Sequence, residues 1–539
     1  MVSKYNGISM KNEDASILSE LEKIIGEPIP QIDELNRFAF GYKLQDDKVV
    51  GLSLFEKEIK QFPECIINLE NLETLNLRNN QLESIPETID NLSKLVNLGL
   101  VGNKIEYLPE SIGNLLDLQV LNITLNQLKE LPESIGNLTN LIILSLNNAR
   151  ITKLPKSIGK LINLKQLWVE YGILEEIPET LGDMKNLERI YLADNKIAEL
   201  PESIGKLTKL RTLLVLKNRL KSIPNSIGNL SELKIIGARF NQIESLPESI
   251  GNLRNLLTLN LDGNQLKELP ESIGNLTELK SLWITNNNLT TLPDSIGKLK
   301  NLSTLLLTNN QIKKLPDSIG ELSSLVLLKL RCNSLTKLPD SIGNLKKLQE
   351  LFVDCNKLES LPIILANLVN LQNLYLQNNM LKEIPNEIST IPELKDLNIS
   401  NNLLISLPDN IGQLSELRRF EASDNRIKYL PDSISKLTNL RELRLDYNEI
   451  FELPEDIGNL ESLHTFVLRK TYMESLPKSF GKLVNLVDLD LKFVSLEKIP
   501  DFVVNLPKLQ NLWISVHWWW EFDDSNLKDL EKKGCKIKR

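Results

Sequence analysis

The stretch that decides the fold is residues 72–94, LETLNLRNNQLESIPETIDNLSK, and an equivalent stretch begins at Leu95. Proline marks the same register along the chain, because it recurs every 23 residues from Pro63 to Pro500 without an insertion or deletion. A fixed period of this length is typical of repeat architectures, in which each unit buries its apolar face by stacking on its neighbours. The 539 residues are therefore predicted to form a solenoid rather than several globular domains.

Each position of the unit has a physical role. Leu75 and Leu77 are two residues apart, so both point from one face of a short strand into the core, while residues 74, 76 and 78 face outward. Asn80 can hydrogen-bond backbone groups of neighbouring turns where the strand bends away, and its equivalents are expected to form a ladder. Pro86 has no N–H and a fixed φ, which suits the first position of a short helical or 3₁₀ segment on the return side.

The unit L-x-x-L-x-L-x-x-N-x-L resembles the leucine-rich repeat. The form with Leu-Pro-x-Ser-Ile-Gly-x-Leu is similar to the 23-residue, intracellular Ras-group repeats, which include a scaffold that binds Ras-type GTPases and related plant and prokaryotic proteins. The resemblance implies an α/β repeat solenoid, a horseshoe with a parallel β-sheet on the concave face and short helical or 3₁₀ turns on the convex face. About 20 repeats are expected over residues 49–522.

The two ends are expected to cap this solenoid. Residues 1–48 are predicted to be an N-terminal helical cap and lead-in, and residues 523–539 a C-terminal capping helix and tail. A helical stripe ended by Gly26 and Pro28 comprises Ile17, Leu18, Leu21, Ile24 and Ile25. His517 takes a ladder position, and the three tryptophans at 518–520 are expected to pack under the C-terminal cap.

Composition and motifs argue against an enzyme and against a metal or cofactor site. With 2 His and 4 Cys in the chain, most His-based acid–base, nucleophilic and metal sites are not expected, and no phosphate-binding G-x-x-x-x-G-K-[ST] motif is present. Most Glu and Asp residues recur with the repeat, which is typical of a solvated face. The formal net charge of −8 argues against binding nucleic acid or an anionic membrane. We therefore expect a non-enzymatic protein without cofactor or metal.

The sequence also favours a cytoplasmic, monomeric protein. The first residues contain no apolar signal segment, and the charge-free stretch 361–380 is too polar to span a membrane. Four Cys in so long a chain are no disulfide framework. Cys332 and Cys355 are 23 residues apart and should lie on adjacent turns, so they are either two reduced thiols or a redox-sensitive bridge.

Outward strand positions carry the information about partners, because in this family partners usually bind the concave face. Early repeats place Asn, Thr and Gly there, whereas aromatic and basic residues take over from the fifth in-phase unit. Exposed aromatics beside Arg are typical of interface hot spots. The predicted protein-binding surface comprises Trp168, Tyr171, Arg189, Tyr191, Lys217, Arg219, Arg239, Phe240, Trp283, Phe352 and Tyr375. The alternative is that these aromatics only shield the sheet and touch each other.

At the outward positions from Trp168 to Phe240, basic residues outnumber acidic ones, which favours a partner with an acidic surface. The basic residues are Arg189, Lys196, Lys217, Arg219 and Arg239, and the acidic ones are Glu170 and Asp194. In a second patch near the C-terminus acidic and basic residues alternate, so mutual pairing and partner binding explain the charges equally well. That patch comprises Arg419, Arg444, Tyr447, Arg469 and Tyr472. The asparagine ladder is interrupted beside both surfaces, at Ala149 and Gly172 and again at Thr471 and Val494.

The main hypothesis is a non-enzymatic, protein-binding scaffold of intracellular signalling. A Ras-like small GTPase is the partner class that the resemblance favours, while the residues alone indicate only a protein with an acidic surface. The alternative is a receptor-like module that senses a peptide or a glycan, because Trp168 and Trp283 could also stack on sugars.

Overall fold

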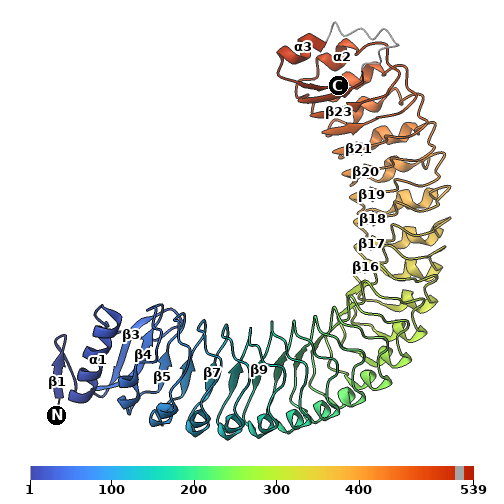
Figure 1. Cartoon of the computed structure of the whole chain (residues 1–539). Coiled ribbons are helices and arrows are strands. Elements are labelled where there is room, and N and C mark those ends of the chain that lie inside the picture. Colours follow the sequence, from blue (N-terminus) through green and yellow to red (C-terminus); the bar gives the residue numbers. More distant parts are fainter. Residues whose placement is uncertain (1, 516–526) are drawn as a thin grey trace. The chain divides into compact units, whose positions relative to one another are not determined.

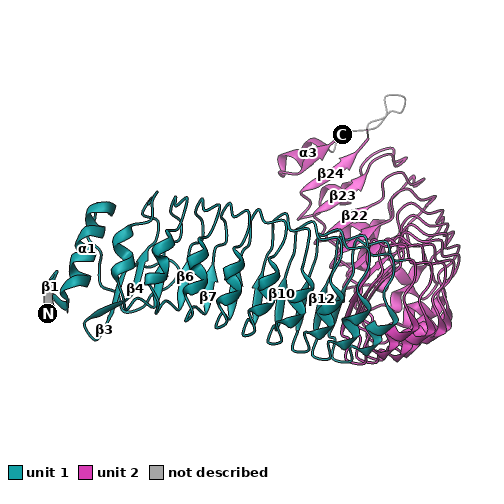
Figure 2. Ribbon diagram, turned by 60° about the horizontal axis from the view of Figure 1, so that its bottom comes forward, with its two compact units in different colours: residues 1–266 teal, residues 267–539 magenta. Residues whose placement is uncertain are grey.

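The computed structural model describes residues 2–515 and 527–539 (Figure 1). The chain divides into two compact units, residues 1–266 (unit 1) and 267–539 (unit 2), and each is described by itself (Figure 2). His517 and the tryptophans at 518–520 lie outside the described residues, so their predicted ladder and cap roles stay predictions.

Unit 1 begins with elements that do not belong to the repeat. The strands β1 (Val2–Tyr5) and β2 (Ile8–Lys11) form an antiparallel hairpin, α1 (Asn12–Ile25) follows, and β3 (Phe40–Gln45) pairs antiparallel with β4 (Lys48–Leu54). The helix ends at Gly26 in the left-handed region (φ 80°), as predicted. Ile24 was predicted to belong to the apolar stripe of this helix, but it is 52% exposed in the last turn. The buried part of the stripe therefore ends at Leu21. The carboxylate of Asp14 ties the helix to β4 by accepting the Val49 N–H at 2.8 Å.

The repeats of unit 1 place one short parallel strand beside the next, starting at β4. These strands are β5 (Thr74–Asn76), β6 (Asn97–Gly99), β7 (Val120–Asn122), β8 (Ile143–Ser145), β9 (Gln166–Trp168), β10 (Arg189–Tyr191), β11 (Thr212–Leu214), β12 (Ile235–Gly237) and β13 (Thr258–Asn260). The 3₁₀ turns are η1 (Glu64–Asn68), η2 (Glu87–Asn91), η3 (Glu110–Asn114), η4 (Glu133–Asn137), η5 (Lys156–Lys160), η6 (Glu179–Asp183), η7 (Glu202–Lys206), η8 (Asn225–Asn229) and η9 (Glu248–Asn252).

Unit 2 continues the same pattern with parallel neighbours in register. Its strands are β14 (Ser281–Trp283), β15 (Thr304–Leu306), β16 (Leu327–Lys329), β17 (Glu350–Phe352), β18 (Asn373–Tyr375), β19 (Asp396–Asn398), β20 (Arg419–Glu421), β21 (Glu442–Arg444), β22 (Thr465–Val467), β23 (Asp488–Leu491), β24 (Asn511–Ile514) and β25 (Lys536–Lys538). Its helices are η10 (Glu271–Asn275), η11 (Asp294–Lys298), η12 (Asp317–Glu321), η13 (Asp340–Asn344), η14 (Ile363–Asn367), η15 (Asn386–Thr390), η16 (Ile411–Gln413), η17 (Asp432–Lys436), η18 (Ile457–Asn459), η19 (Lys478–Lys482), α2 (Asp501–Val504) and α3 (Leu527–Lys532).

The predicted inside and outside of the repeat are confirmed. Leu75 and Leu77 are fully buried, while Thr74 and Asn76 are half-buried on the outer side of β5. Pro86 differs slightly from its prediction, because it precedes η2 in an extended conformation (φ −72°, ψ 155°) rather than opening the turn as its first residue. Both units are therefore α/β repeat solenoids of the predicted class. We call the side of the strands that bears the outward side chains the sheet face.

The asparagine ladder is confirmed where asparagine is present. The Oδ1 of Asn103 accepts the Leu82 N–H at 3.0 Å, and its amide nitrogen donates to the carbonyls of Leu77 and Leu100 at 2.9 and 3.0 Å. Two bonds per buried side chain join neighbouring repeats and the third lies within its own repeat, so the ladder fixes their lateral register.

Glycine allows the return side to pack as closely as the sheet does. A Cβ at Gly113 in η3 would lie 2.4 Å from the carbonyl oxygen of Ser134 in η4. A larger residue at position 113 would therefore collide with that carbonyl unless the two turns moved apart. Among the described residues, no helix is long and apolar enough to cross a membrane.

Candidate functional site

In unit 1 the aromatic residues of the sheet face stack on one another. Trp168 and Tyr191 are register partners on β9 and β10, and their ring centroids are 3.7 Å apart with planes at 14°. The indole N–H of Trp168 donates to the Oε1 of Gln166 at 3.3 Å. On its other side Trp168 pairs with Ser145 of β8, so no aromatic neighbour lies next to it there. The two rings form one half-buried platform.

Two further aromatic residues stand at the loop edge of this face. Tyr171 and Phe240 are 56% and 48% exposed, and both have a left-handed backbone with φ of 58° and 56°. Phe240 lies over Gly263, since a Cβ there would be 2.5 Å from its Cδ1. The guanidinium carbon of Arg239 is 5.6 Å from the Phe240 ring centroid. Small neighbours and a cation thus support an aromatic ring that water still reaches.

The basic residues of this region differ in whether they are paired. The Nζ of Lys217 is 3.0 Å from the Oδ2 of Asp194, and Lys196 is 3.7 Å from Glu175. Arg189, Arg219 and Arg239 are exposed and make no ion pair within residues 2–515 and 527–539. The structure therefore leaves three arginines with free charge around the aromatic platform. Eight residues of the predicted binding surface lie in unit 1, and we call them the unit 1 cluster: Trp168, Tyr171, Arg189, Tyr191, Lys217, Arg219, Arg239 and Phe240.

Where the asparagine ladder is interrupted beside this cluster, Asn147 and Glu170 form hydrogen bonds between the two repeats. Asn147 accepts the Glu170 N–H with its Oδ1 at 2.8 Å and donates to the Glu170 Oε2 at 3.4 Å. Burial raises the pKa of the Glu170 carboxyl. The Asn147 bonds hold Glu170 beside Tyr171, a local rearrangement that the repeat pattern did not predict.

On the sheet face of unit 2 a second stack is present. Phe352 and Tyr375 are register partners whose ring centroids lie 4.7 Å apart with planes at 6°, and the Nζ of Lys329 is 4.9 Å from the Phe352 ring. Trp283 pairs with Leu306, and its indole nitrogen is buried without a hydrogen-bond partner among the described residues. All three predicted aromatics of unit 2 lie on the sheet face.

The second predicted patch separates into parts. The Nε of Arg419 is 3.1 Å from a Glu442 oxygen and 3.8 Å from Asp396, while the Nε of Arg444 donates to Glu442 at 2.6 Å. Glu442 therefore bridges two arginines on neighbouring strands. For these residues the geometry matches mutual pairing.

Tyr447 and Arg469 belong to a different group at the loop edge. The guanidinium carbon of Arg469 lies 5.5 Å from the ring centroids of both Tyr447 and Phe493, and the Nζ of Lys470 is 4.7 Å from Tyr447. Two rings thus enclose the cations of the repeat between them. Tyr472 points to another neighbour, Phe451, with ring centroids 5.7 Å apart.

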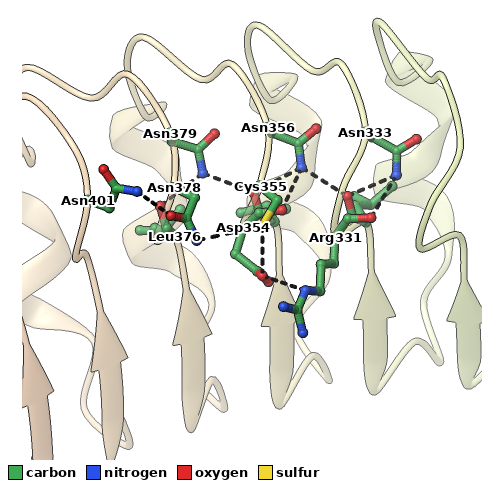
Figure 3. A network of polar contacts seen from close by, with 11 residues as sticks. Arg331, Asn333, Asp354, Cys355, Asn356, Leu376, Asn378, Asn379 and Asn401 are labelled. Atoms are coloured by element: carbon green, nitrogen blue, oxygen red, sulfur yellow. Dashed lines mark hydrogen bonds and ion pairs between the residues drawn. The ribbon is translucent and has the colours of Figure 1, made fainter.

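A polar network that was not predicted from the sequence spans three neighbouring repeats, those of Lys329, Phe352 and Tyr375 (Figure 3). Asp354 is 1% exposed, and its Oδ2 receives the Nε–H of Arg331 at 2.9 Å. The Sγ of Cys355 is 3.8 Å from the same oxygen, and Asn378 donates to that sulfur at 3.6 Å. Burial raises the pKa of the Asp354 carboxyl despite the nearby guanidinium, and burial also raises the pKa of the Cys355 thiol. The spacing of 23 residues between Arg331 and Asp354 was the available signal.

Cys332 and Cys355 are free thiols in the structure, as are Cys65 and Cys535. Within the described residues, no group of three His, Cys, Asp or Glu side chains is arranged to hold a metal ion.

A hollow of about 580 Å³ opens at the start of the sheet face in unit 1. Its floor is Asn76, Asn97, Gly99 and Asn122, and residues 34–37 of the lead-in form one wall. From the sequence, this lead-in was predicted only to belong to the N-terminal cap. Small polar residues make the hollow, because no large side chain fills the outward strand positions there.

Comparison with known proteins identifies the repeat. The family model "Leucine-rich repeat region" matches residues 50–124, 91–190, 157–238, 224–305, 271–374 and 432–532. The models "Leucine rich repeat" and "Leucine Rich Repeat" match residues 392–450 and 370–391. Among curated proteins, none matches the chain significantly.

Solved structures agree with the family models. The chain is similar to a leucine-rich-repeat protein of Leptospira interrogans, with 34% identity, 75% of this chain and 97% of that chain covered, and a TM-score of 0.59. It is similar to the plant peptide hormone receptor RGFR1 in complex with RGF2, with 31% identity, 92% and 90% coverage and a TM-score of 0.59. It is also similar to the Arabidopsis receptor kinase HAESA in complex with the peptide hormone IDA and the co-receptor SERK1, with 27% identity, 94% and 95% coverage and a TM-score of 0.60.

Repeats of this kind form protein-binding scaffolds and are typically non-enzymatic. The family models match well over half of the residues, and the repeat geometry agrees with them. The chain therefore belongs to the leucine-rich-repeat family.

Proposed function

We propose that this protein is a non-enzymatic scaffold that binds an acidic protein partner through the unit 1 cluster. The observation that carries the proposal is the set of three exposed arginines, Arg189, Arg219 and Arg239, around the stacked rings of Trp168 and Tyr191. Aromatic and Arg side chains dominate binding energy in protein interfaces. A preformed ring platform also loses little conformational entropy on binding, which favours affinity.

The charge of the partner follows from the pairing of the basic residues. Lys217 already faces Asp194, whereas the three arginines have no carboxylate of their own. On a chain with net charge −8, an uncompensated basic group attracts an acidic surface locally and repels basic ones. Carboxylates of a partner can then form bidentate bonds with the guanidinium groups.

The sheet face of unit 2 offers a further contact region for the same kind of partner. Trp283, Phe352 and Tyr375 lie there, and Lys329 supplies a cation beside the Phe352–Tyr375 stack. In the second patch, Tyr447 remains a candidate contact, while Tyr472 contacts Phe451 and the charges of Arg419 and Arg444 are already used within the chain.

A role in intracellular signalling, with a Ras-like small GTPase as partner, is the finer part of the proposal. It rests on the similarity of the 23-residue repeat to the Ras-group form. The competing candidate is peptide recognition, because RGFR1 and HAESA were solved with peptide hormones. A glycan would need an open aromatic face, which the Ser145 side of Trp168 provides.

The test compares the wild-type protein with a Trp168→Ala/Arg239→Glu variant. Both are immobilised and exposed to cytosolic extract and, separately, to a Ras-like GTPase loaded with GDP or a non-hydrolysable GTP analogue. A protein retained only by the wild type supports the proposed surface, and retention that depends on the nucleotide supports the GTPase class. The matched control is Asn122→Ala, which changes the same repeat position two units earlier on β7.

Identical retention by the variant and the wild type, with matching circular dichroism, would contradict the proposal and favour aromatics that only shield the sheet. Thermal stabilisation by an oligosaccharide or a short peptide, lost in Trp168→Ala, would instead favour the sensing module.

A further inference from the structure

Five consecutive repeats of unit 2 carry an exposed apolar side chain on the flank, between the sheet face and the 3₁₀ turns. We call this set the flank stripe, and its members are between 46% and 64% exposed: Met380, Ile405, Tyr429, Phe451 and Tyr472. In the first repeat of unit 1 the equivalent positions hold Gln81, Glu83 and Ser84. Of these five residues, only Tyr472 was predicted from the sequence to belong to a binding surface.

The aromatic members of the flank stripe are continuous. The ring centroids of Tyr429 and Phe451 are 6.3 Å apart, and those of Phe451 and Tyr472 are 5.7 Å apart. Side chains on successive repeats therefore form one apolar line on the surface.

Folding does not require these side chains on the surface. The core of the same repeats is completed by fully buried neighbours such as Leu381, Ile427 and Ile450. An exposed, contiguous apolar patch on a soluble repeat calls for a partner, because isolated exposed residues are ordinary but continuous ones are not.

Acidic side chains border the flank stripe on the side of the 3₁₀ turns. Elsewhere in unit 2 a groove of about 930 Å³ is lined both by flank residues such as Lys314 and by turn residues such as Asp317, three positions later. The equivalents of those two positions at the stripe are Tyr429 and Asp432, so a ring and a carboxylate occupy the positions that line the groove in the earlier repeats. Exposed acidic residues along this margin are Asp409, Asp432, Glu452, Glu455, Asp456 and Glu474. Basic residues of the same repeats are fewer than the acidic ones: Lys382, Arg426 and Lys478 are exposed, and Lys428 is 3.8 Å from Glu449.

The spacing of the flank stripe selects the form of the occupant. Neighbouring strands lie about 4.8 Å apart, so five repeats extend over roughly 19 Å. An α-helix repeats its apolar face about every 5.4 Å and covers that length with about 13 residues, whereas alternate side chains of a strand are about 6.7 Å apart. The helix matches the pitch of the flank stripe better.

We propose that the flank stripe docks a basic amphipathic helix of a partner protein. The apolar face of the helix packs against Ile405, Tyr429, Phe451 and Tyr472, and its Lys or Arg residues face the acidic margin. This helix-in-groove mode uses anchors at i, i+3, i+4 and i+7. The surface lies in unit 2 and suits a partner of opposite charge, so it does not depend on the function proposed above.

The experiment uses full-length protein and two fluorescent helical peptides with the same Leu face, one with Lys and one with Glu on the polar face. Fluorescence anisotropy should show saturable binding of the Leu/Lys peptide and at least about tenfold weaker binding of the Leu/Glu peptide. A Tyr429→Ser/Phe451→Ser/Tyr472→Ser variant should bind the Leu/Lys peptide at least about tenfold more weakly. Its charge equals that of the wild type, so non-specific attraction would be unchanged.

Two controls keep the result specific. Tyr107→Ser removes the exposed tyrosine that occupies in unit 1 the repeat position of Tyr429, and it should leave binding unchanged. Trp168→Ala should also leave it unchanged, because that residue belongs to the unit 1 cluster. Asp432→Lys/Glu455→Lys, which alters only exposed residues, should reverse the preference between the two peptides.

Equal binding of the Leu/Lys peptide by the wild type and the triple serine variant, with unchanged melting curves, would overturn the proposal. So would equal binding of both peptides. Self-association in sedimentation velocity that the triple variant abolishes would identify a second copy of this chain as the occupant and would also overturn it.

Discussion

The sheet faces of the two units use the same residue types and arrive at different charge states. In unit 2, Arg419 has Asp396 and Glu442 as its lateral neighbours and forms ion pairs with both. In unit 1, Arg189 stands at the same repeat position, but its neighbours are Gln166 and Thr212. An arginine is therefore available to a partner or consumed within the chain according to the residues 23 positions before and after it. The side chains of the adjacent repeats therefore decide whether an arginine of the sheet face carries an unpaired charge.

The largest expected effect contrasts the two aromatic stacks. Trp168→Ala should weaken binding of the acidic partner by about 2 kcal/mol or more, because it removes the ring platform surrounded by free arginines. Phe352→Ala is expected to weaken binding less, since a single lysine, Lys329, lies beside that stack in place of the three arginines. Isothermal titration calorimetry with the captured partner measures both values. A larger loss for Phe352→Ala would show that unit 2 holds the main binding surface.

The second prediction turns unit 1 into a copy of unit 2. A Gln166→Asp/Thr212→Glu variant gives Arg189 the two carboxylate neighbours that Arg419 has. Partner affinity should fall about tenfold, which corresponds to about 1.4 kcal/mol, because the new ion pairs compete with the partner. Asn97→Glu places a carboxylate at the same repeat position on β6, away from the arginines, and serves as the control. Unchanged affinity in the double variant would mean that Arg189 makes no contact with the partner.

The third prediction removes the bridge of unit 2. Glu442→Gln should destabilise β20 and β21 locally by about 1 kcal/mol, a modest value because Arg419 and Arg444 are half exposed and solvent screens their charges. Hydrogen–deuterium exchange of the amides in these strands reports the change. Glu350→Gln alters the same repeat position on β17 and should leave exchange as it is. Equal protection in both variants would show that the pairing contributes no stability.

The smallest effect is a dependence on pH at the buried pair of Asp354 and Arg331. Burial raises the pKa of the Asp354 carboxyl, so the folded state holds this proton more tightly than the unfolded chain does. The stability cost is absent below the ordinary carboxyl range and develops as pH rises through it. The melting temperature of Asp354→Asn minus that of the wild type should therefore increase between about pH 4 and pH 7.

The exposed Asp340→Asn, also in unit 2, provides the matched control for the loss of one carboxylate from the surface. A difference for Asp354→Asn that shrinks with pH would mean that the Arg331 ion pair outweighs burial.

Periodicity predicted most of the fold because each repeat obeys one geometric rule. The 23-residue register was enough to place Leu75 in the core, Asn103 in the ladder and Trp168 on the sheet face. The antiparallel strand β3, which pairs with the strand of the first repeat, was missed, since it lies before the periodic stretch and has no repeat to define it.

The candidate site was less accessible from the sequence. Lateral spacing held the answer for Arg419 and Arg331, but whether a side chain of the right charge bends toward its neighbour depends on three-dimensional packing. The flank stripe was overlooked because its members occupy different positions of the unit, so no single alignment column shows them. The left-handed backbone at Tyr171 and Phe240, by contrast, recurs at the same repeat position from Asn79 to Phe493, so it follows from the register of the repeat rather than from residue type.

The strict register of the lateral contacts has a consequence for how such a chain changes over generations. Loss or duplication of one whole 23-residue segment leaves every stacking contact intact except at the junction, since the ladder bonds and turn contacts recur in each repeat. The junction alone receives new neighbours. Excision of residues 420–442, for example, would remove Glu442 and bring Arg419 next to Arg444, exchanging a charge bridge for two adjacent cations in a single genetic event. Unequal recombination can thus change the surface charge of this protein while the remaining repeats keep their stacking contacts.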